Sequence, residues 1–193
     1  SGQTQALVTV TLSNDAVFEN NETFTIDLSS AVNATISDNQ GLATITDNAD
    51  LPNLAVNDVT ANEEAGTFIF TVTKTGATLQ TSTVSYTTTD GSATDSNDYI
   101  AQSGTLTFTA GQTQALVTVT ITNDAVFENT ETFTLDLSAA VNATITDTQA
   151  LATITDNADL PNLAVNDVTA NEEAGTFIFT VTKTGSTLQT TTV

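Results

Sequence analysis

The sequence predicts an all-β fold made of tandem, immunoglobulin-like antiparallel β-sandwiches of about seven strands each. Apolar residues alternate with threonines at a period of 2, which is typical of half-buried strands. The sequence also repeats itself at an offset of 109 residues, which is the size of one small domain. No segment has the pattern of a long amphipathic helix, so both observations favour a chain of β domains.

The repeat is close to exact. Residues 51–84 recur as residues 160–193 with only 2 of 34 positions different. Residues 1–50 recur as residues 110–159, where 9 of 50 positions differ, mostly conservatively. Solenoid repeats run roughly 20–50 residues, so a unit of this length indicates a string of domains rather than a coil.

The domain boundaries are expected at the polar, proline-containing segments 47–52 and 156–161. Residues 1–50 are then the C-terminal part of one repeat, 51–159 a complete repeat, and 160–193 the N-terminal part of the next. We interpret the chain as a window on a longer tandem array. The alternative is that incomplete end repeats are completed by another chain.

Each strand of the complete repeat is predicted from its own alternation. In Thr67–Lys74, for example, Phe68, Phe70 and Val72 share one face and threonines occupy most of the other. Threonine suits the outer face of a solvated sheet because it is β-branched yet polar. The expected strands are Leu54–Val56, Thr67–Lys74, Val84–Thr88, Thr105–Thr109, Val117–Thr122, Thr132–Leu137 and Ala152–Ile154.

The composition excludes several classes of protein. The chain has 23 acidic and 2 basic residues, a net charge of −21, and no Cys, His, Met or Trp. Disulfide frameworks, the usual zinc sites and histidine-dependent catalytic triads are therefore ruled out, and we expect no enzyme. The negative charge disfavours nucleic acid, and no apolar run is long enough for membrane insertion. This composition suggests a secreted protein of the bacterial cell surface.

The acidic residues gather in the predicted loops. Loops of a sandwich collect at its two ends, where crowded carboxylates repel one another unless cations neutralise them. The complete repeat offers only Lys74 for this purpose, and flexible loops rich in carboxylates suit Ca²⁺. The alternative, left open by composition, is that these acids only solvate the surface.

An ordered set of five motifs resembles the Calx-beta domain. The motifs are Asn62–Val72, Tyr86–Tyr99, Ser103–Gly111, Asn123–Phe133 and Ala152–Asp159. The resemblance covers the complete repeat and, through the partial repeats, the whole chain. It implies an immunoglobulin-type β-sandwich and a Ca²⁺ cofactor.

The resemblance also implies metal ligands at matching positions. In the complete repeat these are Glu63, Glu64, Asp90, Asn123, Asp124, Glu128, Glu131, Asp156 and Asp159. In the partial repeats they are Asp15, Glu19, Glu22, Asp47, Asp50 and Glu172. Calcium sensors of the family carry consecutive Asp residues where this chain has Asn123-Asp124 and the tetrapeptide 156–159. That departure favours one or two ions of modest affinity.

The sequence predicts a calcium-stabilised spacer or adhesive repeat of a large extracellular surface protein or filament. Near-identical repeats favour this function, because length and stiffness require no variety. The alternative is a calcium-sensing or ligand-binding module, which predicts loops that vary between repeats. The expected partners are neighbouring repeats and identical chains in a fibre. We also expect calcium to bind acids on both sides of a repeat junction and to stiffen it.

Overall fold

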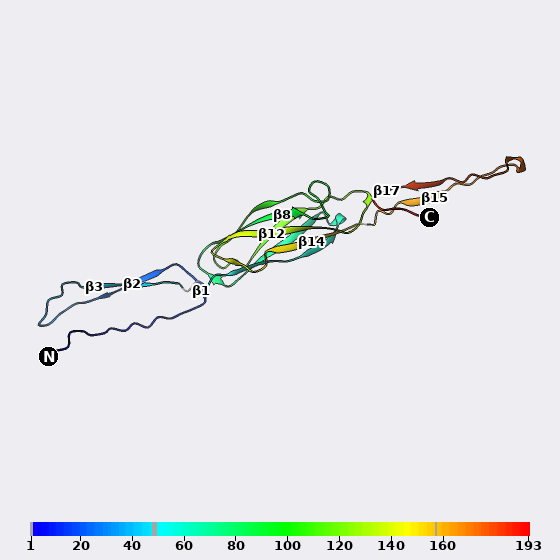
Figure 1. Cartoon of the computed structure of the whole chain (residues 1–193). Helices are drawn as coiled ribbons and strands as arrows, with labels where there is room; N and C mark the ends of the chain where they lie inside the picture. Colours follow the sequence, from blue (N-terminus) through cyan, green and yellow to red (C-terminus); the bar gives the residue numbers. More distant parts are fainter. Residues whose placement is uncertain (1, 48–49, 157) are drawn as a thin grey trace.

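The computed structural model describes residues 2–47, 50–156 and 158–193. It shows one β-sandwich in the middle of an elongated molecule, with the chain extending as long hairpins on either side (Figure 1). The prediction of an all-β fold is confirmed, and within the described ranges the helical elements are two single 3₁₀ turns, η1 (Glu63–Ala65) and η2 (Glu172–Ala174). No helix there is long and apolar enough to cross a membrane.

Two sheets form the sandwich. The first has the order β10-β6-β4-β13 and the second the order β5-β14-β12-β8-β9. Most neighbours are antiparallel, while β13–β4 and β14–β5 are parallel. The first sheet comprises β10 (Gln114–Thr120), β6 (Thr67–Thr75), β4 (Asn53–Val56) and β13 (Thr144–Ile145). The second comprises β5 (Val59–Asn62), β14 (Gln149–Thr155), β12 (Glu131–Val141), β8 (Ser82–Asp90) and β9 (Ser103–Phe108).

Within the described residues, each flanking segment contains a two-stranded hairpin and pairs with the complete repeat at a junction. On the N-terminal side, β2 (Glu22–Asp27) pairs with β3 (Gln40–Ile45), and on the C-terminal side β15 (Asn162–Val165) pairs with β16 (Val181–Thr184). In addition, β1 (Val17–Phe18) pairs with β7 (Ala77–Thr78), and β11 (Val126–Phe127) pairs with β17 (Ser186–Thr187).

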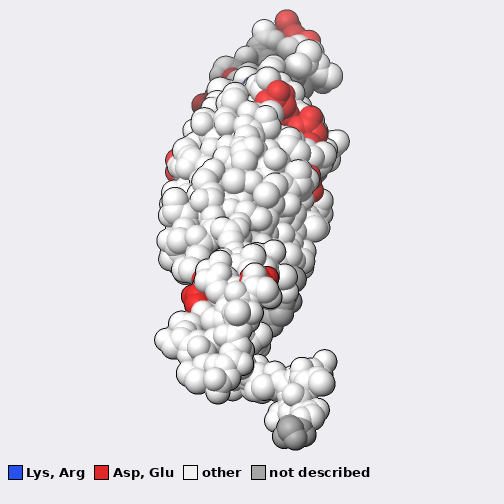
Figure 2. Space-filling view, turned by 90° about the vertical axis from the view of Figure 1, so that its left-hand side faces the viewer, with Lys and Arg blue, Asp and Glu red and all other residues white. Residues whose placement is uncertain are grey.

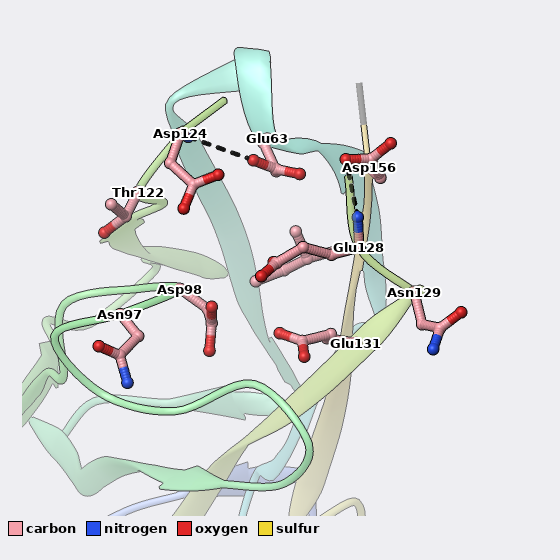
Figure 3. A pocket seen from close by; sticks show the side chains of 10 residues that line it. Glu63, Asn97, Asp98, Thr122, Asp124, Glu128, Asn129, Glu131 and Asp156 are labelled. Atoms are coloured by element: carbon pink, nitrogen blue, oxygen red, sulfur yellow. Dashed lines mark hydrogen bonds between the residues drawn. The ribbon is translucent and has the colours of Figure 1, made fainter. Parts of the chain in front are cut away.

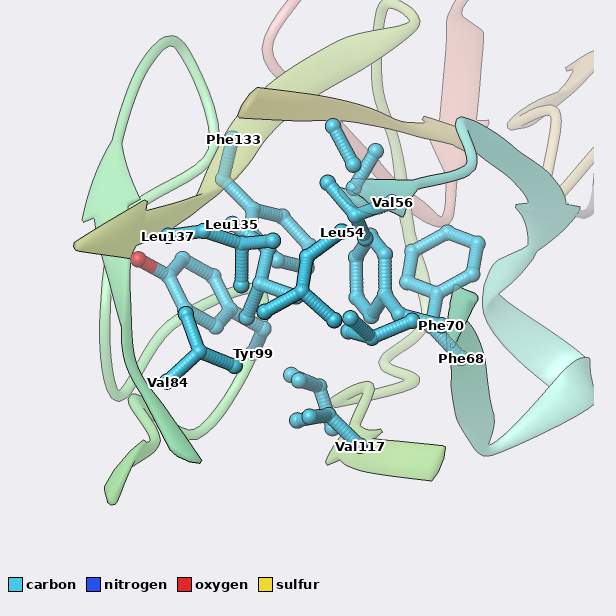
Figure 4. Packing of buried hydrophobic residues seen from close by; sticks show 14 of the residues in the cluster. Leu54, Val56, Phe68, Phe70, Val84, Tyr99, Val117, Phe133, Leu135 and Leu137 are labelled. Carbon is cyan, nitrogen blue, oxygen red and sulfur yellow. The ribbon is translucent and has the colours of Figure 1, made fainter. Parts of the chain in front are cut away.

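The core lies between the two sheets and is built from the alternating apolar residues (Figure 4). Phe133 is at its centre: its ring stacks on Tyr99 with centroids 4.0 Å apart and also contacts Phe68 and Phe70 at 5.8 and 6.2 Å. All four rings are at most 2% exposed. The hydrophobic face predicted from the period of 2 is therefore the face that packs.

All seven predicted strands are present, and the structure adds to the sandwich the two-residue β13 and also β5, neither of which the alternation indicated. Strand β5 lies at the edge of its sheet, where Val59 and Ala61 pack against the core. The same sequences behave differently in the partial repeats. Phe177 and Phe179, which correspond to the buried Phe68 and Phe70, are 58% and 61% exposed, because no second sheet covers β16 and the residues before it.

Candidate metal site

Six carboxylates meet at one end of the sandwich (Figure 3). They come from four separate parts of the repeat: the turn before β6, the β8–β9 loop, the segment that follows β10 up to the first residue of β12, and the residue after β14. On the face drawn in Figure 2, acidic side chains lie toward both ends of the body, and no basic side chain stands out among them. The carboxylates belong to Glu63, Asp98, Asp124, Glu128, Glu131 and Asp156, and Asn97, Thr122, Asn129 and Ile154 complete the lining.

A tight turn positions Glu63. This residue begins η1, and Gly66 ends that turn with a φ of 70°, a left-handed conformation that glycine adopts without strain. The Gly66 amide donates to the Glu63 carbonyl at 3.2 Å, and the Ile121 amide donates to the Gly66 carbonyl at 3.0 Å. The turn is therefore tied to the strand that leads into the loop of Asp124, and the buried Glu63 side chain points toward that loop.

The β8–β9 loop carries Asp98 to the site because it is anchored on two sides. The Ala93 amide donates to the Thr132 carbonyl at 2.9 Å, next to Glu131. The Thr122 amide donates to the Asp98 carbonyl at 2.9 Å. The Asp98 carboxylate itself accepts a bond of 2.7 Å from the Thr94 amide. This loop therefore bridges the starts of two segments that supply other carboxylates.

Backbone amides link the remaining acids. The Asp124 amide donates to Glu63 Oε2, and the Glu128 amide donates to Asp156 Oδ1, both at 3.4 Å (Figure 3). The Val126 amide donates to Asp124 Oδ1 at 2.7 Å, which fixes the turn between these residues. The carboxylates thus accept hydrogen bonds from backbone amides, and the charged side chains that surround each of them are other carboxylates.

The electrostatic cost of this arrangement is visible in the pKa values. Burial raises the pKa of Glu63 to about 7; the charges of Asp156 and Asp124 add to the rise, and the bond from the Asp124 amide opposes it. Burial, together with the charges of Asp98 and Glu128, raises the pKa of Glu131 to about 7. The pKa of Glu128 is also raised, by burial and by neighbouring carboxylates. Among the described lining residues no Lys or Arg offsets these charges.

The spacing of the acids fits a hard divalent cation. Carboxylate oxygens of Asp98, Glu128 and Glu131 all lie within 4.8 Å of one another. Oxygens that share one Ca²⁺ at roughly 2.3–2.6 Å can be at most about 5.2 Å apart, so these three can bind the same ion. The cavity among the acids is small, about 10 Å³, close to the roughly 10–15 Å³ that one water molecule needs.

The structure brings together five of the nine positions predicted in the complete repeat, namely Glu63, Asp124, Glu128, Glu131 and Asp156. The other four predicted positions do not line the pocket. Glu64 is exposed, and Asp90 instead accepts bonds from the Tyr99 hydroxyl at 2.6 Å and the Asp95 amide at 3.0 Å. Asn123 directly precedes the site residue Asp124, and Asp159 follows Asp156 by three residues.

Asp98 is the acid that sequence reasoning left out. It belongs to the Asp90–Asp98 group, from which the resemblance selected Asp90. The signal that points to Asp98 is its neighbour Tyr99, which is 1% exposed and packs in the core, so the preceding residue lies at the rim of the sandwich.

The partial repeats show part of the same pattern. On the N-terminal side Asp15, Glu19, Glu22 and Asp47 line one pocket, as their equivalents do in the complete repeat, while Asp50 does not line it. On the C-terminal side Glu172 lines a different pocket with Phe177. The described lining of the six-carboxylate pocket comes from residues 63–156. That acids from both sides of a junction share one ion stays a prediction.

Comparison with known proteins identifies the fold and its family. The sequence profile of the Calx-beta domain matches residues 1–50 and 46–159. The chain belongs to the Calx-beta domain family. The Calx-beta sandwich of this chain is similar to the apo-form Calx CBD1 domain, with a TM-score of 0.53, 24% identity, and coverage of 55% of this chain and 98% of that one. It is also similar to the calcium binding domain CBD12 of CALX1.1, with a TM-score of 0.51, 25% identity, and coverage of 54% and 45%.

Two sequence relatives are much larger proteins than this chain. Mouse extracellular matrix organizing protein FRAS1 is 37% identical over 126 residues, which is 61% of this chain and 3% of FRAS1. Mouse sodium/calcium exchanger 1 is 38% identical over 77 residues, which is 39% of this chain and 8% of the exchanger. The matches thus span a small fraction of either relative.

Proposed function

We propose that this chain is a calcium-stabilised spacer or adhesive segment of a large extracellular surface protein or filament. The observation that carries the proposal is the meeting of six carboxylates, from four parts of the repeat, at one end of the sandwich. Asp98, Glu128 and Glu131 would hold the ion, with Glu63, Asp124 and Asp156 around it. A bound Ca²⁺ would neutralise their repulsion and crosslink the segments that carry them.

The location outside the cell is supported by chemistry and by one relative. FRAS1 is named an extracellular matrix organizing protein, and it shares 37% identity with this chain over the matched segment. The absence of Cys and the charge of −21 agree with a calcium-rich setting outside the cell. The near-identity of the repeats favours a spacer over a calcium-sensing or ligand-binding module, since a specific binding surface is rarely needed in every copy.

Thermal unfolding of the whole chain tests calcium binding. A ligand that binds only the native state stabilises it by about 2.7 kcal/mol at a hundred times its Kd. We expect millimolar Ca²⁺ to raise the midpoint by several degrees over chelator, and Mg²⁺ to raise it much less. Glu131→Gln should remove most of this shift, whereas Asp147→Asn, an exposed acid in the turn before β14, should retain it. An equal shift in both variants would contradict the assignment.

The spacer function is tested by the dimensions of the chain in solution. Small-angle X-ray scattering with calcium and with chelator should show a longer or less variable particle when calcium is bound. Glu131→Gln should give the chelator profile under both conditions. Identical profiles of the unaltered chain with and without calcium would count against calcium as a stiffening agent.

A further inference from the structure

The two repeat boundaries in this chain are joined by the same contact. At the first boundary β1 of the preceding repeat pairs in parallel with β7, with Val17 opposite Ala77 and Phe18 opposite Thr78. At the second, β11 pairs in parallel with β17, with Val126 opposite Ser186 and Phe127 opposite Thr187. Each pair lies 109 residues from its counterpart, so the contact repeats with the sequence.

The hydrogen bonds around these pairs recur as well. The Leu79 amide donates to the Phe18 carbonyl at 3.1 Å, and the Leu188 amide donates to the Phe127 carbonyl at 3.2 Å. The hydroxyls of Thr78 and Thr187 donate to the same two carbonyls, at 3.1 and 2.9 Å.

A side-chain amide completes each contact. Gln80 Nε2 donates to Asn20 Oδ1 at 2.7 Å, and Gln189 Nε2 donates to Asn129 Oδ1 at 2.7 Å. In both copies the threonine hydroxyl also accepts a bond of 2.9 Å from the backbone amide of this glutamine, which holds the corner in shape. The contact therefore has a donor side and an acceptor side. The donor side is the Thr-Leu-Gln corner, residues 78–80 and 187–189. The acceptor side is the Val-Phe-Glu-Asn segment, residues 17–20 and 126–129.

The contact depends on the backbone and on three polar side chains. Position 77 is Ala and its equivalent 186 is Ser, yet both pair in the same register. Leu79 and Leu188 are 68% and 77% exposed, so their side chains add little. Threonine, glutamine and asparagine carry the specificity, because each has its own donor or acceptor in the contact.

We propose that the Val-Phe-Glu-Asn segment of each repeat is a docking strand for the Thr-Leu-Gln corner of the next repeat, and that this join sets the orientation of successive repeats. The partner is a second copy of the same unit. The linker keeps the two sides at high effective concentration, so a short contact is sufficient. Relative motion is the default for domains joined by a linker alone, and this join removes it. The proposal does not depend on the metal site.

Distances between spin labels on the full chain test the proposal. The chain has no Cys, so labels can be attached only at introduced positions. One pair, Thr23→Cys with Thr118→Cys, spans the first boundary, and another, Thr118→Cys with Thr182→Cys, spans the second; all three threonines are exposed. Each pair should give a single narrow distance distribution at a fixed calcium concentration.

Variants at one boundary serve as matched controls for the other. Thr187→Val with Gln189→Ala should broaden the second distribution roughly twofold or more and leave the first unchanged. Thr78→Val with Gln80→Ala should broaden the first distribution and leave the second unchanged. Leu188→Pro removes the amide that donates to the Phe127 carbonyl and also restricts the backbone of the corner, so it should broaden the second distribution too. Broad distributions in the unaltered chain, or variants that leave both unchanged, would overturn the proposal.

Discussion

Replacing Glu63 by glutamine should stabilise the metal-free protein and weaken its response to calcium. Glu63 is 5% exposed, and its pKa is raised from 4.5 to about 7. A shift of about 2.5 units at about 1.36 kcal/mol each means that ionised Glu63 costs the native state about 3 kcal/mol at pH 8. Glu63→Gln has nearly the same shape without the charge, so it should recover most of that cost in chelator.

The pH dependence of this effect follows from the direction of the shift. Below pH 4.5 Glu63 is protonated in both the folded and the unfolded chain, and the substitution should change little. Between pH 4.5 and 7 the unfolded chain loses its proton first, so the metal-free native state is destabilised as the pH rises. Above pH 7 the full cost is present. Calcium should compete with the retained proton, so its affinity should fall as the pH drops below 7.

Urea denaturation measures both effects. In chelator at pH 8, Glu63→Gln should raise the free energy of unfolding by about 2–3 kcal/mol, and in calcium the gain should shrink or reverse because a negative charge beside the ion is lost. Glu64→Gln is the matched control: this neighbour is exposed, and a change within about 0.5 kcal/mol is expected. If Glu63→Gln destabilises the metal-free protein at pH 8, the ionised carboxylate does not impose this electrostatic cost on the native state.

Three further substitutions, one of them with a matched control, test other parts of the structure. Asp98→Asn should weaken calcium binding about tenfold or more in isothermal titration calorimetry, and unchanged affinity would remove this residue from the site. Phe133→Leu should cost about 1–3 kcal/mol in urea denaturation, whereas Phe177→Leu, at a 58% exposed position, should cost almost nothing; equal losses would contradict the packing. Tyr99→Phe deletes the 2.6 Å bond to Asp90 and should cost about 1–2 kcal/mol in the same assay; no loss would show that the bond contributes nothing.

The fold was predictable because each long strand carries its own signal. In β6 the buried residues Phe68, Phe70 and Val72 alternate with the outward-facing Ile69 and Thr71, and this alternation decides which face packs. Strand β5 was missed because its apolar members, Val59 and Ala61, are only half-buried. Strand β4 is equally short but was predicted, because its apolar residues Leu54 and Val56 are large and buried in the core.

The site was predictable only in part, for a different reason. Five of its acids were found because the resemblance fixes their order along the chain, but order does not say which side chains converge in space. Asp90 and Asp98 lie in the same loop, yet Asp90 is bonded to the Tyr99 hydroxyl whereas Asp98 reaches Glu128 and Glu131. The choice between them depends on how the loop is anchored to Thr122 and Thr132, which is a tertiary contact.

The short segment between β10 and β12 takes part both in the proposed metal site and in the proposed contact between repeats. Asp124 and Glu128 line the carboxylate pocket, while Val126 and Phe127, between them, pair with the next repeat. The carbonyl of Glu128 also accepts a bond of 3.3 Å from Gln189. A substitution that moves this backbone therefore disturbs ligand positions and docking together. Residues 15–19 at the preceding boundary also line a carboxylate pocket and pair with the next repeat. Residues 15–19 and 124–128 have the same sequence, and these two shared roles give a physical reason for it.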